Sequence, residues 1–338
     1  MKNNRILAAV LVVSILTAGG AYVWHEGRPI KELRVGSDVG GDVAEDVSPA
    51  LSSPIPEPRQ TAVLPSEDTP FRLVVDELRR RSAAGDAAAA CRLAAEHLYC
   101  SQVAPRRAAL DYWLTQQSWI LEKADAGPNS VALGKSMEKE MEFAIKGLAG
   151  VTSHCQGVEQ PSASQIAKLW RASALAGNPS ALRQYASGDA FSRAQTLDSL
   201  SELATYREEA ERIATVSGSR GDINMLLSLA AGYHPTEFEP RSLLGQALER
   251  DAARALATYR HIDTALRLHG QDKLRVGREV RHRIEQLEQG LPPTELARAD
   301  DIALEEIAKW RAPDLRGVKL LSPGGDQPNV DNRAVCKH

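Results

Sequence analysis

The sequence predicts an all-α protein whose helices pair into a helical-repeat array, an α/α solenoid. Aromatic residues are only 5% of the chain and alanine is abundant, which favours closely packed helices over a sandwich or barrel. In addition, three Gly-Asp or Gly-Asn pairs are each followed at the same distance by a leucine or tyrosine and then an alanine. The residues that define this repeat are Gly85, Asp86, Leu93, Ala94, Gly177, Asn178, Tyr185, Ala186, Gly221, Asp222, Leu229 and Ala230.

Each of these pairs has the chemistry of a corner between two helices. Glycine adopts the left-handed conformation that ends a helix, and Asp or Asn accepts the free backbone N–H groups that begin the next one. The small residue beside a large one predicts an inner face on which neighbouring helices approach closely.

Composition limits the classes of partner. The chain of 338 residues has 43% hydrophobic and 25% charged residues, enough for one large or two ordinary folded domains. Its net charge of -3 shows no basic excess, so nucleic acid is not an expected partner.

Residues 1–24 are predicted to be a targeting segment. Lys2 and Arg5 precede an uncharged run over residues 6–24, which is long enough to approach the thickness of a bilayer core. The favoured interpretation is an uncleaved signal anchor that tethers a periplasmic protein to the inner membrane. The alternative is a signal peptide cleaved near the small residues 19–21, which leaves a soluble periplasmic or secreted protein.

Residues 25–69 are rich in proline, glycine, serine and acidic residues and lack a sustained apolar period, so they are predicted to be a disordered linker. Thr69 and Pro70 then provide an N-cap and a first-turn proline, which places the start of the folded domain at residue 70. That domain is expected to end at residue 311. Residues 312–338 are predicted to be a disordered tail.

Apolar periodicity and helix-capping residues predict the helices of the domain. In order, they are expected over residues 70–82, 86–98, 105 onward, 129–148, 162–176, 178 onward, 192–216, 222 onward, 241–269 with a break near the middle, 272–289 and 294–311. The helix over 86–98 is expected to form a hairpin with the helix that starts at Pro105, and 129–148 to pair with 162–176.

Two faces are expected to be buried in these helices. The helix from Pro105 is expected to pack through Leu110, Trp113, Leu114, Trp119 and Leu121. The last helix is expected to cap the array through Leu296, Ala299, Ala303, Ile307 and Trp310.

The first repeat resembles the Sel-one-like repeats, a branch of the tetratricopeptide-like α/α solenoids. The matching residues are Gly85, Asp86, Leu93, Ala94, His97, Val103, Ala109, Tyr112 and Trp113, with His97 where the family prefers tyrosine. The resemblance covers residues 71 to about 311 and is partial beyond two units. It implies a solenoid fold and a role as an adaptor in envelope assembly, signalling or host interaction.

No constellation of catalytic, cofactor-binding or metal-binding residues is found in the sequence. Ser136 and Lys139 match the S-x-x-K of penicillin-recognising enzymes, but the supporting K-T-G and S-D-N motifs are missing. The histidines are scattered and form no H-E-x-x-H. We therefore predict a non-enzymatic scaffold that binds a protein or peptide through a concave helical surface. An envelope hydrolase or other cell-wall enzyme and a structural spacer are the alternatives.

One predicted helix, residues 272–289, has a basic side. A solvated outer face explains it, and a patch for an anionic partner is the functional alternative. The residues of this possible patch are Lys273, Arg275, Arg278 and Arg281.

The four cysteines predict at least one disulfide, because export places them in an oxidising compartment. Cys100 and Cys155 are favoured, since both lie in corresponding turns of successive units. Cys91 with Cys155 remains an alternative, and Cys91 with Cys100 requires the helix between them to end early. Cys336 is expected to be free or intermolecular.

Overall fold

A computed structural model describes most of the predicted helical domain and short pieces on either side of it. The described residues are 54–57, 62–123, 128–191, 196–235, 242–313, 315, 333 and 336. The predicted membrane segment, residues 6–24, and most of the predicted linker and tail lie outside them. Among the described residues, none of the helices combines the length and apolar character that a membrane crossing requires.

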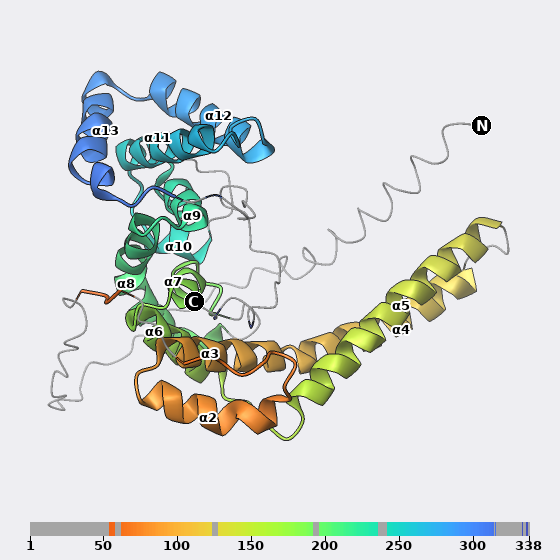
Figure 1. Cartoon of the computed structure of the whole chain (residues 1–338). Coiled ribbons are helices and arrows are strands. Elements are labelled where there is room, and N and C mark those ends of the chain that lie inside the picture. The colour runs from red at the N-terminus through yellow and green to blue at the C-terminus, as the bar shows by residue number, and fades with distance from the viewer. Residues whose placement is uncertain are drawn as a thin grey trace, which may run out of the picture. The chain divides into compact units, whose positions relative to one another are not determined.

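Every regular element in the described residues is a helix, which confirms the all-α prediction (Figure 1). The helices are α2 (Phe71–Ala83), α3 (Ala87–Ser101), α4 (Val103–Lys123), α5 (Pro128–Cys155), α6 (Ala163–Leu175), α7 (Pro179–Ala186), α8 (Leu200–Ser219), α9 (Ile223–Tyr233), α10 (Leu243–Ala247), α11 (Ala252–Leu268), α12 (Arg275–Gly290) and α13 (Pro293–Glu305), with 3-10 turns η2 (Leu197–Ser199) and η3 (Ile307–Lys309). The break expected within residues 241–269 separates α10 from α11. The helix predicted from residue 272 begins at Arg275.

The three predicted corners share one backbone geometry. Gly85, Gly177 and Gly221 have φ angles of 85°, 90° and 92°, the left-handed region that glycine adopts without a steric penalty. The amide of the next residue donates to the carbonyl five positions earlier, at 3.0, 3.2 and 3.2 Å in the three corners. The side chains of Asp86 and Asp222 then accept the first free amides of α3 and α9. Asn178 caps α7 in the same way.

The inner faces predicted from the repeat are buried. Leu93, Tyr185 and Leu229 are at most 4% exposed, and the alanine after each is fully buried. The repeat therefore places equivalent residues in equivalent environments, because the corner fixes the register of the helix that follows it.

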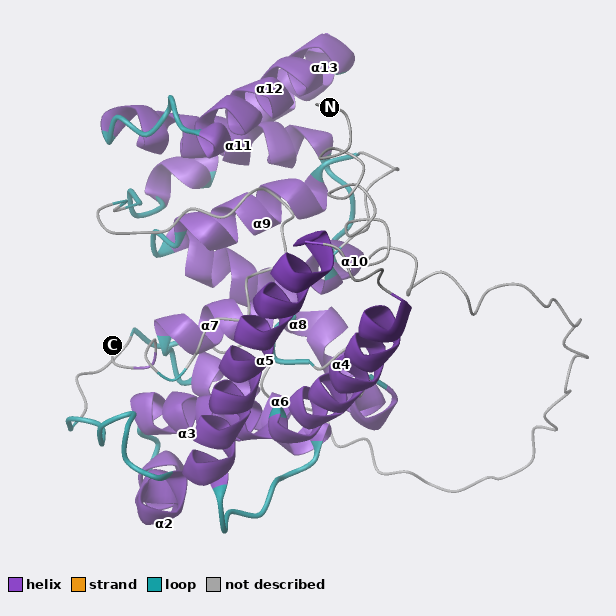
Figure 2. Cartoon of the chain, turned by 90° about the vertical axis from the view of Figure 1, so that its right-hand side faces the viewer, coloured by secondary structure: helices purple, strands orange, loops and turns teal. Residues whose placement is uncertain are grey.

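The predicted pairing of the early helices is wrong. The chain continues from α3 into α4 after Gln102 alone, and α3 packs against α2 and α6. α4 packs instead against α5, so these two helices form a hairpin inserted between two corner units, as Figures 1 and 2 show. α6 packs on α3, α7 and α8, not on α5 as expected. No glycine and no residue in the left-handed conformation lies between α3 and α4, so α4 follows α3 without a corner.

Most of the helix pairs share a single hydrophobic core. α7 packs on α8, α9 on α11, and α11 on both α12 and α13. One buried cluster extends through these contacts from Cys91 of α3 to Ile302 of α13. A smaller cluster around Phe71 and Leu78 joins α2 to α3 and the end of α5.

α13 packs on α11. Ala299 is fully buried and Ile307 is 3% exposed, and both belong to the main core. Leu296, Ala303 and Trp310 are partly buried against it. α13 therefore closes one end of the core with a face that is apolar inside and charged outside.

Enlarging Ala299 to leucine should lower the free energy of unfolding by about 2 kcal/mol, since extra methylene groups in a packed core force neighbouring side chains apart. Ala297 of the same helix is exposed and provides the matched control. Denaturant unfolding of Ala299→Leu and Ala297→Leu compares the two. Equal stability of both variants with the parent chain would contradict the packing of α13 on α11.

Candidate interaction surfaces

The α4–α5 hairpin exposes large apolar side chains. On α4, Tyr112 is 65% exposed, Trp113 47% and Leu114 43%. On α5, Phe143 is 81% exposed and Ile145 48%. Exposed large apolar side chains are typical of surfaces that contact another molecule.

The burial predicted for the apolar side of α4 is therefore wrong at Trp113 and Leu114. Three successive helical residues point in directions about 100° apart, so one neighbouring helix cannot cover all of them. α5 is the main neighbour of α4, and its own buried residues include Met137 and Val151. The side chains of Trp119 and Leu121 lie outside the described part of α4.

A disulfide fixes the base of this hairpin. Cys100 near the end of α3 is bonded to Cys155 at the end of α5, with a Cα–Cα distance of 5.6 Å and a sequence separation of 55 residues. The favoured pairing is confirmed, and the alternative of Cys91 with Cys155 is not observed. The positions differ from those expected, however, because the two cysteines bracket the inserted hairpin and do not lie in stacked turns. The bond joins the chain segments that enter and leave the hairpin.

A buried ion pair lies inside α3, and the sequence analysis missed it. Arg92 is 1% exposed and Glu96 is fully buried, and Nε of Arg92 donates to Oε1 of Glu96 at 2.8 Å. The other carboxylate oxygen lies 2.8 Å from Nε2 of His154 on α5. The signal was present as an Arg and a Glu four residues apart in an alanine-rich helix. The contacts of Glu96 with Arg92 and His154 tie α3 to the end of α5.

The prediction of a free or intermolecular Cys336 is wrong. Cys336 is bonded to Cys91 of α3 across a sequence separation of 245 residues, and both are fully buried. Nearby, the guanidinium carbon of Arg333 lies 3.8 Å from the centre of the Tyr99 ring. Leu315 is also fully buried. These described residues of the predicted tail therefore belong to the folded domain.

His97 packs against an aromatic ring. Its ring meets Phe71 edge-on, with 5.0 Å between the centroids. Burial and the nearby positive charge of Arg79 lower the pKa of His97 to about 4. His97 is consequently neutral at pH 7.

Only some residues of the possible anionic-partner patch are exposed to solvent. Lys273, Arg275 and Arg278 are exposed at the start of α12, and Arg278 donates to the carbonyl of Lys273 at 2.7 Å. Arg281 is half-buried and donates to the carbonyl of Asp272 at 2.8 Å. It lines an open hollow of about 530 Å³ between α11 and α12.

That hollow has charges of both signs. Arg260, Arg267 and Arg281 line it together with Asp263, Glu285 and Glu288. Arg267 pairs with Asp263 at 2.7 Å, and Arg260 pairs with Glu288 at 2.8 Å. The balance of charge favours a structural network over a site for an anion.

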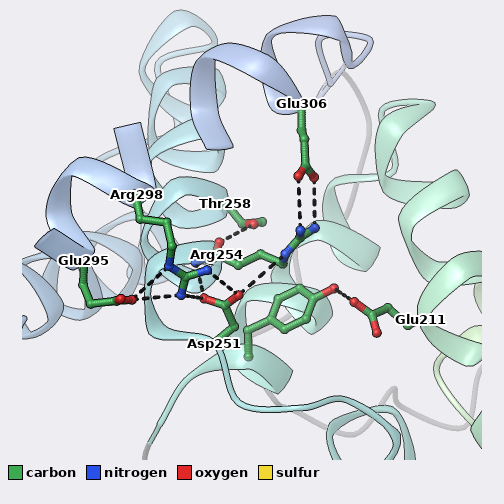
Figure 3. Close-up of polar contacts among 8 residues, drawn as sticks. Glu211, Asp251, Arg254, Thr258, Glu295, Arg298 and Glu306 are labelled. Atoms are coloured by element: carbon green, nitrogen blue, oxygen red, sulfur yellow. Dashed lines mark hydrogen bonds and ion pairs between the residues drawn. The ribbon is translucent and has the colours of Figure 1, made fainter. Parts of the chain in front are cut away.

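A second ionic network attaches the capping helix, as Figure 3 shows. Arg298 of α13 donates to Asp251 at 3.0 Å and to Glu295 at 2.8 Å. Arg254 of α11 forms two bonds with Glu306, at 3.0 and 3.2 Å. Asp251 also caps α11 by accepting the amide of Arg254. These contacts join α11 to α13 and explain the polar residues gathered there.

The described residues show no group of three or more His, Cys, Asp or Glu side chains arranged to hold a metal ion. Ser136 and Lys139 are both exposed on α5, as expected for a solvent-facing stretch of helix. Comparison with protein-family models, with curated proteins and with solved structures finds no match to the chain.

Proposed function

We propose that the chain is a non-enzymatic scaffold or adaptor of the bacterial cell envelope that binds a protein or peptide partner. The observation that supports it most directly is the α4–α5 hairpin, which presents Tyr112, Trp113 and Phe143 to solvent. Aromatic side chains of this kind contribute most of the binding energy at many protein interfaces. The disulfide at the base of the hairpin holds this surface in place and limits the entropy lost on binding.

The two disulfides fit an oxidising, exported environment. The proposal adds the finer location, a periplasmic protein held at the inner membrane through residues 6–24. It also adds the architecture, in which the corner-linked helix pairs form a Sel-one-like solenoid. The repeated corner geometry and the single core shared by successive pairs support that architecture.

Site-specific photo-crosslinking in intact cells tests the proposal. A photoreactive phenylalanine derivative at Phe143 is expected to give one recurring partner, identified by mass spectrometry, in amounts comparable with the chain itself. Leu304 on α13 is the matched control, because it is 73% exposed and apolar but lies outside the hairpin.

A charged variant strengthens the test. Trp113→Glu should reduce crosslinking from position 143 about tenfold, since a charge at the centre of an apolar interface typically costs more than 1.4 kcal/mol. Equal partner yields at Phe143 and Leu304, or no partner at either position, would refute the hairpin as the binding surface.

A further inference from the structure

Four residues of the predicted linker lie on the folded domain like a bound peptide. Residues 54–57 read Pro-Ile-Pro-Glu, and Ile55 is 9% exposed within the main hydrophobic core. Prolines on both sides of Ile55 restrict the backbone and disfavour a helix. The prediction of a linker as far as residue 69 therefore does not hold for this segment.

An arginine holds the backbone of the segment. Nη2 of Arg220 donates to the carbonyl of Ile55 at 2.7 Å and to the carbonyl of Pro56 at 2.9 Å. Arg81 holds the carbonyls of Ala62 and Val63 in the same manner, at 2.6 and 3.0 Å. Contacts to main-chain carbonyls supply affinity for a peptide backbone whatever its side chains are.

The side chains of the segment meet an apolar position and two arginines. Ile55 fills an apolar position in the core, and the Glu57 carboxylate lies 3.6 Å from Arg220 and 4.0 Å from Arg311. Between them, the carbonyl of Pro56 lies against the corner glycine Gly177. A Cβ atom on that glycine would collide with the carbonyl oxygen of Pro56, so only glycine permits the contact.

The corner at Gly85 shows that this contact is not part of corner geometry itself. Gly85 has nearly the same φ as Gly177, 85° against 90°. A Cβ atom on Gly85 would nevertheless meet nothing within 4 Å. Gly177 is therefore under two constraints, its own backbone conformation and the close approach of residues 54–57.

We propose that Gly177, Arg220 and Arg311 form a peptide-binding site for a partner segment of the type aliphatic-Pro-acidic. Residues 55–57 occupy this site as an internal ligand, and a partner peptide of the same chemistry competes for it. A segment of four residues offers few contacts, so its hold depends on the high local concentration that its attachment to the domain provides. A partner that also binds elsewhere on the chain gains the same advantage and displaces it.

Peptide binding to the full chain tests the site. The probe is a fluorescein-labelled peptide of sequence LSSPIPEPRQ, residues 51–60 of this chain, followed by fluorescence anisotropy. Ile55→Asp should release the internal ligand, and this variant is expected to bind the probe at least tenfold more tightly than the parent chain. Adding Arg220→Ala, or replacing glutamate by lysine in the probe, should weaken binding at least tenfold. Binding that is unaffected by Arg220→Ala would overturn the proposal, as would no binding to an Ile55→Asp chain that melts like the parent.

A second measurement does not depend on the Ile55 variant. Gly177→Ala and Gly85→Ala introduce similar backbone strain, but only the first obstructs Pro56. Limited trypsin cleavage after Arg59 should be at least fivefold faster in Gly177→Ala than in the parent chain and change less than twofold in Gly85→Ala. Equal acceleration in both variants would also overturn the proposal.

The peptide site rests on the proposed interaction role, but the experiments can refute the peptide site and the hairpin surface separately. Loss of probe binding with crosslinking at Phe143 intact would remove only the peptide site. Probe binding that depends on Arg220, in a chain that gives no partner at Phe143, would remove only the hairpin surface.

Discussion

Replacing Glu96 with alanine is expected to lower the free energy of unfolding by about 3–5 kcal/mol, because it leaves the buried guanidinium of Arg92 without its counter-charge. Arg92 is 1% exposed, so water cannot replace the lost carboxylate. His154 loses the same partner at 2.8 Å, which loosens the contact between α3 and α5. Denaturant unfolding followed by circular dichroism measures the change.

Two variants separate this effect from ordinary loss of a side chain. Arg92→Met with Glu96→Leu replaces the pair by apolar groups of similar size and should cost less than Glu96→Ala alone. Asp76→Ala removes the acid of an exposed pair with Arg79 on α2, and we expect a change within about 0.5 kcal/mol. If Glu96→Ala were as mild as Asp76→Ala, Arg92 would not depend on Glu96 for its burial.

Removing the hairpin disulfide is the second large effect we expect. Cys100→Ala with Cys155→Ala should destabilise the chain by about 4 kcal/mol, because the unfolded chain regains the entropy of a loop closed across 55 residues. For a domain of this size the melting temperature should fall by about 8–16 °C. Scanning calorimetry of the oxidised proteins gives the comparison.

Hydrogen exchange locates the same change. Amides of α4 and α5 should exchange faster in the Cys100→Ala, Cys155→Ala variant, since the ends of α3 and α5 are no longer joined. α9 and α11 do not pack on α3 or α5, so their amides should keep their protection until global unfolding. A destabilisation below about 1 kcal/mol, with unchanged exchange in α4 and α5, would mean that packing alone holds the base of the hairpin.

The corners were predictable because their causes are local. Gly85 and Asp86 need only their own conformational and hydrogen-bonding preferences to end α2 and begin α3, and the same holds at Gly177 and Gly221. The register of the following helix then places Leu93 or Leu229 inside. Residues next to one another in sequence are sufficient for that part of the fold.

The inserted hairpin was not predictable in the same way. Nothing between Ser101 and Val103 shows whether the chain turns back on α3 or continues into α4, since neither glycine nor proline lies there. The choice depends on where α6 packs, and α6 begins more than 60 residues later. Trp113 therefore looked like a core residue by periodicity, although the helix that should cover it lies elsewhere.

The peptide-binding site and the second disulfide depend on contacts between residues far apart in sequence. Arg220 and Ile55 are separated by 165 residues, and Cys91 and Cys336 by 245. Composition assigned Ile55 to a linker and Cys336 to a tail, because proline and polar residues surround both. Such contacts stabilise segments that have no structure-forming tendency of their own.

The bond between Cys91 and Cys336 also determines how the protein responds to mechanical force. A pull applied at the two ends of the chain passes along the first 91 residues, crosses the disulfide and continues from Cys336. The chain between the two cysteines carries no tension while the bond is intact. α4 to α13 are therefore shielded from unfolding by traction, and only α2 and the start of α3 lie on the stretched path. Cutting that single bond would extend the tension to the end of α3 and to α6 through α13, while the Cys100–Cys155 bond would still bypass α4 and α5.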